Sequence, residues 1–127
     1  VMLKYGIMNQ WAAKRAFPLA DASSTGILNM APVRLTLTRQ HKLQQRLEEL
    51  GHEKIMKAFD WLSSGNQQEI IKRGYQFAAE PTTVTTVISG TSSITHLEAN
   101  VAALDDTLSD QEIDRLKKLL GDSSSPD

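Results

Sequence analysis

Apolar residues are arranged along the chain in two ways, as short apolar-rich segments and as stripes with helical spacing. The short segments occupy residues 2–8, 27–31 and 83–88, and the last of them is rich in β-branched residues. Short apolar runs of this kind are typical of parallel strands that are buried on both faces. We therefore predict three strands in these segments.

Between the runs, apolar residues recur every three or four positions, which indicates amphipathic helices. Pro18 divides segment 11–25 into two short helices, because proline is tolerated in the first turn of a helix. A leucine stripe predicts a helix from about residue 38 to Gly51, and a further helix ends before Pro81. Helices thus separate the second strand from the third as well as the first from the second.

Two helices are predicted after the third strand. Ile94, Leu97, Val101 and Leu104 keep helical spacing, and we expect this face to pack against the sheet. The last helix, which ends at Gly121, is expected to pack through its own apolar stripe.

Ser109 and Glu112 have the spacing of a capping box at the start of that last helix, and Leu108 and Ile113 occupy the positions of a hydrophobic staple. The ordered domain is expected to span residues 1–121. Residues 122–127 are expected to form a mobile polar tail.

Strands that alternate with helices predict an α/β fold with right-handed βαβ units and a parallel sheet. The three strands should pair in sequence order, with helices mainly on one face. A closed (β/α)₈ barrel typically needs about 250 residues. The chain has 127 residues, so the prediction is a partial (β/α)₈ (TIM) barrel.

Composition narrows the class of protein. The chain has 14 basic and 15 acidic residues, a net charge of −1 and no cysteine. Near-zero charge gives no general attraction to nucleic acid, and the absence of cysteine excludes disulfides and thiolate metal sites. The apolar runs are too short to span a bilayer, and no secretory signal pattern is present. We expect a cytoplasmic protein that binds neither membrane nor nucleic acid.

Three further kinds of functional site, for nucleic acid, for a metal ion and for a serine nucleophile, are not supported by the sequence. The basic residues near 34–42 are interpreted as a solvated helix face, because acidic residues follow directly. His41, His52 and His96 lack the spacing of a metal site. No G-x-S-x-G nucleophile motif occurs in the sequence.

The turn after the third strand raises one chemical question. Gly90, Thr91, Ser92 and Ser93 connect an apolar strand to a predicted helix. A tight strand-to-helix turn directs backbone N–H groups and the positive end of the helix dipole at one point, which suits a phosphate. Small polar residues are also ordinary in connecting loops between α/β elements. The spacing alone favours the connecting loop over the phosphate site.

The order of these motifs resembles the C-terminal half of an aldo-keto reductase, a family of (β/α)₈-barrel enzymes that use NADPH. The resemblance covers residues 1–121. The matching segments are the strand at 26–32, the end of the helix at 71–81, the strand at 84–90, and the turn and helix at 92–100. The start of a further helix with the pattern Leu-Ser-x-x-Glu follows them. The resemblance implies that the three strands are the sixth, seventh and eighth of the barrel.

The resemblance also implies a role for the turn in binding the adenosine phosphate end of NADP(H). Gly90, Thr91, Ser92 and Ser93 would line it. His96 would take the place that usually holds an Arg or Gln near the 2′-phosphate, and Asn100 would bind the adenine. Ala99 stands where the family commonly has Glu.

Departures from the family pattern concern the chemistry. The catalytic Tyr, Lys, His and Asp of the family have no counterpart in this chain. Met30 stands where an aromatic residue commonly stacks on the nicotinamide, and Met2 replaces a carboxamide. By the same comparison, Tyr5 and Tyr75 match structural positions.

Two functions follow from the resemblance. The chain is either a part of an NADPH-dependent reductase that is inactive alone, with cofactor binding weak or lost, or a non-catalytic half-barrel that self-associates without a cofactor. Both hypotheses predict a homo-oligomer, because unpaired strand edges and an exposed inner sheet face invite association. The candidate inner-face residues are Leu3, Ile7, Leu28, Met30, Val84 and Val87.

Overall fold

The computed structural model describes residues 1–121, and the predicted tail at 122–127 lies outside this range. Strands and helices alternate as the sequence predicts. In chain order the elements are β1 (Met2–Leu3), α1 (Trp11–Arg15), α2 (Phe17–Ala22), β2 (Ile27–Asn29), α3 (Arg34–Thr38), α4 (Gln40–Glu49), α5 (His52–Ala58), α6 (Asp60–Ser63), α7 (Gln67–Ala79), β3 (Val84–Val87), α8 (Ile94–Ala102), the 3₁₀ helix η1 (Ala103–Asp105) and α9 (Asp110–Leu120).

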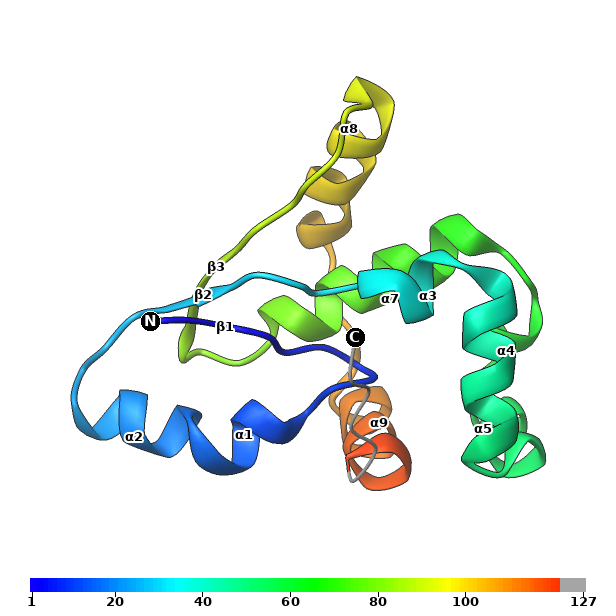
Figure 1. The fold of residues 1–127 in the computed structure, drawn as a ribbon, viewed down its shortest axis with the longest axis horizontal. Helices are drawn as coiled ribbons and strands as arrows, with labels where there is room; N and C mark the ends of the chain where they lie inside the picture. The colour runs from blue at the N-terminus through cyan, green and yellow to red at the C-terminus, as the bar shows by residue number, and fades with distance from the viewer. Residues whose placement is uncertain (122–127) are drawn as a thin grey trace.

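The three strands form one parallel sheet in the order β1-β2-β3, as predicted (Figure 1). Leu28 lies opposite Met2 on one side and Thr86 on the other. Each outer strand pairs with a neighbour on one side only within residues 1–121. The sheet is therefore open, and it matches the predicted α/β fold with a partial barrel.

Strand β1 is much shorter than the predicted 2–8 segment, and the side chain of Asn29 accounts for the difference. The amide of Asn29 is fully buried. Its Oδ1 accepts the N–H of Tyr5 at 3.0 Å, and its Nδ2 donates to the carbonyls of Tyr5 at 2.7 Å and Ala78 at 3.3 Å. After Leu3 the chain is thus held by a side chain in place of a strand ladder. Reciprocal hydrogen bonds between Gly6 and Asn9 then turn it.

The two faces of the sheet differ in what covers them. Ile27 and Asn29 are buried beneath helices. On the same side, the ring of Tyr5 packs against the rings of Phe77 and Phe17, with centroid distances of 5.4 Å and 4.9 Å. The opposite face, called the inner face below, exposes four apolar side chains. These are Met2, Leu28, Met30 and Ile88. Alternation along the strands therefore selects Leu28 and Met30 from the predicted inner-face set, and Leu3, Ile7, Val84 and Val87 do not belong to it.

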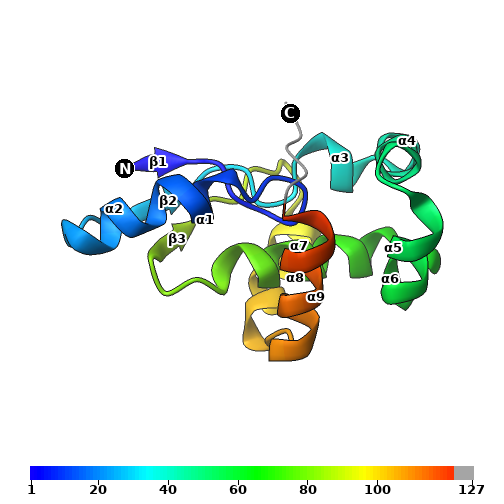
Figure 2. The same ribbon diagram turned by 90° about the horizontal axis from the view of Figure 1, so that it is seen from below.

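The segment after β2 is more divided than the single helix predicted from residue 38. Helix α3 comes first, and an extended Arg39 separates it from α4. Helix α4 ends as predicted, because Gly51 takes a left-handed conformation with φ of 90°. In Figures 1 and 2, α4 and α5 lie at the opposite end of the molecule from α2.

Helix α9 is fixed by contacts from distant parts of the chain. Ser109 caps it by accepting the N–H of Glu112 at 3.2 Å. The carboxylate of Glu112 does not complete the predicted capping box; it accepts from the indole of Trp61 at 2.6 Å and pairs with Arg73 at 3.5 Å. The buried amide of Gln10 donates to the carbonyl of Leu116 at 3.1 Å. The helix therefore joins α6, α7 and the loop after β1.

The prediction that the apolar stripe of α8 packs against the sheet is wrong. Ile94 is 77% exposed and Val101 is 61% exposed, and Leu97 and Leu104 are exposed as well. Helix α8 stands away from the strands at one end of the molecule (Figure 1). On its other side, Asn100 donates a hydrogen bond to Ser89, and no residue of α8 is buried. The helix thus leaves its apolar stripe exposed to water.

Replacement of Asn29 by Ala should strongly destabilise the fold. The change leaves two carbonyls and one N–H buried without partners, and each such group costs about 1–3 kcal/mol. We expect the free energy of unfolding, measured by urea denaturation, to fall by about 3 kcal/mol or more. Gln44→Ala, at an exposed position in α4, is the control and should change it little. A comparable small effect for both variants would contradict the role of Asn29.

Burial and the nearby carboxylate of Glu80 raise the pKa of Tyr5 above its usual value of 10.0. The neutral phenol therefore contributes stability that is complete below about pH 10 and is lost as the pH rises toward the raised pKa of the folded state. The hydroxyl of Tyr5 has no hydrogen-bond partner in the described residues. In urea titrations between about pH 9 and pH 11, Tyr5→Phe should lose stability less steeply than the wild type. Equal slopes would contradict this assignment.

Candidate functional site

A broad cleft lies between α7 and α8, next to the turn that follows β3. Its volume is about 700 Å³, which is in the range of small-molecule sites. Helix α7 lines it with Ile71, Lys72 and Tyr75, and the turn and α8 line it from the other side. Four of the six predicted site residues contribute to its wall: Gly90, Thr91, His96 and Asn100. Ser92 and Ser93 are outside the wall.

The hydroxyl of Ser89 organises the inner end of this cleft. Tyr75 and Ser89 share a hydrogen bond of 2.9 Å between their hydroxyls, and the Nδ2 of Asn100 donates to the same Ser89 oxygen at 2.9 Å. These bonds connect α7, the end of the third strand segment and α8. Because an amide nitrogen carries two hydrogens and the amide oxygen accepts, Asn100 keeps further hydrogen-bonding capacity after bonding Ser89.

The four residues of the turn serve different purposes. Ser93 is the N-cap of α8, and its hydroxyl accepts the N–H of His96 at 3.3 Å. Thr91 accepts the N–H of Ser93 at 3.1 Å. A Cβ at Gly90 would meet nothing within 4 Å. The protein itself therefore does not require glycine at position 90.

Charged side chains at the cleft come from both helices. Lys72 of α7 lines it and pairs with Asp106 at 3.8 Å, with side chains that are 39% and 68% exposed. Such an exposed pair contributes little stability, so the ammonium group can exchange this partner for another anion at low cost. His96 is exposed on the facing wall. An anionic group in the cleft would have a lysine on one side and a histidine on the other.

Sequence reasoning missed three residues of this cleft. Lys72 and Ser89 gave no signal, because a lysine in a helix and a serine at a strand end are common everywhere. Tyr75 matches a structural position of the family and is indeed buried, but its hydroxyl contacts Ser89 at the site. The pairing of residues 75, 89 and 100 depends on how α7 and α8 meet, which periodicity does not reveal.

Two other kinds of site find no support in the described residues. Among the side chains that the structure describes, no group of three or more His, Asp or Glu residues is arranged to hold a metal ion. None of the helices in that range has the length and apolar character that a bilayer crossing requires.

Comparisons with known proteins agree on one family. The model of the aldo/keto reductase family matches residues 1–120. Aldo-keto reductase AKR11C1 from Bacillus halodurans in its holo form is similar in structure, with a TM-score of 0.72 and 20% sequence identity over 98% of this chain. Its apo form has a TM-score of 0.68 and 21% identity over 98% of this chain. No curated protein sequence matches the chain.

The chain spans less than half the length of these structures. It covers 43% of the holo structure and 44% of the apo structure. At such low identity the likeness shows that the fold is shared.

Proposed function

The chain belongs to the aldo/keto reductase family, and we propose on this basis that it carries the adenosine and 2′-phosphate side of an NADP(H) site without the reductase chemistry. The supporting observation is that Gly90, Thr91, His96 and Asn100 line the α7–α8 cleft together. The second candidate function, a self-associating half-barrel without a cofactor, is supported by the exposed apolar surfaces.

The cleft offers the donors that an adenosine phosphate needs. Asn100 keeps an amide hydrogen and an oxygen for an adenine ring, and Ser89 holds the amide in place. His96 and Lys72 offer cationic or hydrogen-bonding groups to a phosphate. At Gly90 the backbone is open, so a ligand can approach it closely. Ala99, which stands where the family commonly has Glu, contributes no polar contact, and we expect binding to be weak.

In this family, bound NADPH supplies a hydride to a carbonyl group. The residues of the family that assist this step have no counterpart in this chain. Tyr5 cannot replace the catalytic acid, because its hydroxyl is buried in the core and its pKa is raised. Tyr75 is bonded to Ser89. The contribution of these 127 residues is therefore cofactor binding.

The isolated chain should bind NADPH weakly and reduce no carbonyl compound. In a fluorescence titration, His96→Ala and Asn100→Ala should each weaken binding about tenfold, which corresponds to about 1.4 kcal/mol. His41→Ala, an exposed histidine in α4, is the matched control and should bind as the wild type does. Gly90→Ala should also weaken binding while leaving the free energy of unfolding unchanged, since its Cβ meets open space. Identical titrations for all variants, or turnover by the isolated chain, would refute the proposal.

Self-association is the basis of the second candidate. The inner face and both sheet edges are open, and α8 exposes its apolar stripe. A soluble monomer rarely leaves several apolar surfaces uncovered. A two-fold pair of chains could cover them, and a stable contact would bury at least about 1,200 Å².

Light scattering at micromolar concentration should therefore give a dimer or larger assembly. Leu97→Glu and Met30→Lys place charges on α8 and on the inner face at exposed positions, so they should lower the mass toward that of a monomer without unfolding the chain. Leu19→Glu, at an exposed position in α2, should leave the mass unchanged. A wild-type monomer that binds no hydrophobic dye would exclude self-association.

A further inference from the structure

The sulfur atoms of this chain all belong to methionine side chains, because the sequence has four methionines and no cysteine. These methionines differ in exposure. Met2 is 55% exposed and Met30 is 44% exposed, whereas Met8 is 6% exposed. Met56 is partly buried and packs against the core. Two thioethers are therefore open to solvent, and packing protects the other two.

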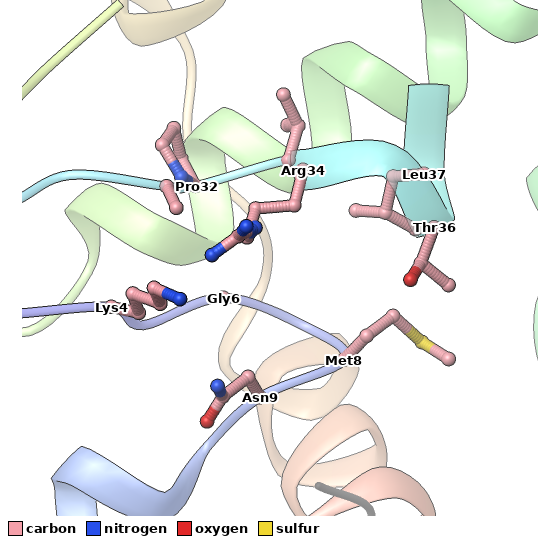
Figure 3. A pocket seen from close by; sticks show the side chains of 10 residues that line it. Lys4, Gly6, Met8, Asn9, Pro32, Arg34, Thr36 and Leu37 are labelled. Carbon is pink, nitrogen blue, oxygen red and sulfur yellow. The ribbon is translucent and has the colours of Figure 1, made fainter. Parts of the chain in front are cut away.

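Met8 shows how this protection arises. It lies in the turn after β1, and Figure 3 shows its side chain next to Thr36 of α3. Met8, Thr36 and Leu37 line one cavity of about 20 Å³, which has room for about one water molecule. A molecule larger than water, such as a peroxide, therefore has little access to the sulfur of Met8.

Met2 and Met30 belong to one surface. Met2 lies opposite Leu28 in the register of β1 and β2. Met30 follows Leu28 by two residues, and its N–H continues the ladder by donating to the carbonyl of Leu3 at 2.9 Å. Side chains two residues apart on a strand leave the same face of a sheet, so both exposed thioethers lie on the inner face.

Oxidation of a thioether changes the chemistry of such a face. A peroxide transfers one oxygen atom to the sulfur, which gives up two electrons, and the peroxide is reduced to water or an alcohol. The sulfoxide that forms is polar, so covering it with apolar side chains costs free energy. In the reverse step two thiols are oxidised to a disulfide, and the sulfoxide oxygen leaves as water.

We propose that Met2 and Met30 form a reversible methionine-oxidation site, and that their oxidation by a peroxide separates chains that associate through the inner face. The site depends on the exposure of the two sulfurs and on their place in the sheet. The separation of chains rests on the self-association proposed above. An associated pair covers both sulfurs, so the peroxide reacts with separated chains and keeps them separate.

The oxidation site is tested by treating the whole native chain, at nanomolar concentration, with hydrogen peroxide. Trypsin then leaves each methionine on a separate peptide, and the four peptides are 1–4, 5–14, 16–34 and 55–57. Mass spectrometry should show that Met2 and Met30 gain oxygen several-fold faster than Met8 and Met56. In urea all four should react alike. Equal rates in the native chain, or faster oxidation of Met8, would overturn the site.

Light scattering and a hydrophobic dye test the effect on the inner face. Oxidation of the wild type should weaken its association at least about tenfold and lower its dye fluorescence. The double variant Met2→Leu, Met30→Leu keeps the volume and apolar character of both side chains, so peroxide should change neither its mass nor its dye binding. Met56→Leu is the matched control and should respond as the wild type does. Methionine sulfoxide reductases with dithiothreitol should restore the wild-type assembly.

The outcomes distinguish a failure of this inference from a failure of self-association. A wild type that is monomeric before oxidation refutes self-association, and the dye then measures the inner face by itself. The effect on the inner face is overturned if an associated wild type keeps its mass after oxidation, if a monomer keeps its dye binding or never had any, or if the double variant responds as the wild type does. In each case the peptide masses decide the oxidation site separately.

Discussion

The buried amide of Asn29 is the interaction on which the sheet depends. Strands of two to four residues form few ladder hydrogen bonds, so the sheet needs another means to hold the chain after Leu3. The Asn29 side chain bonds both backbone groups of Tyr5 and one carbonyl of α7. It thereby fixes the aromatic ring of Tyr5 between Phe17 and Phe77. The position of the chain after β1 and the packing of the core therefore both depend on the side chain of Asn29.

Hydrophobic patterns in the sequence predicted the strand order and the direction of the sheet, because runs of apolar residues alternate with helical stripes. The patterns failed where a single polar side chain decides the outcome. Nothing in the run 27–31 indicates that Asn29 ends the ladder of β1. For α8, periodicity identified which face is apolar, but it cannot tell whether a neighbour covers that face. The exposed Ile94 and Val101 show that none does within residues 1–121.

The cleft was predictable only in part, for a related reason. The residues of α8 and the turn could be assigned through the family resemblance, whereas the wall from α7 could not. Ser89 joins the two walls through Tyr75 and Asn100. The hydroxyl of Ser93 caps α8, and the predicted role of Ser93 at a ligand stays a prediction.

Gln10 has a consequence for the time at which the chain can fold. Its buried amide bonds the carbonyl of Leu116, across 106 residues of sequence. During synthesis the ribosome releases the N-terminal residues first, so the loop after β1 emerges long before its partner exists. Until α9 leaves the exit tunnel, Gln10 can satisfy this bond only with water. The nascent chain must therefore leave this part of its core incomplete until α9 has been synthesised and released.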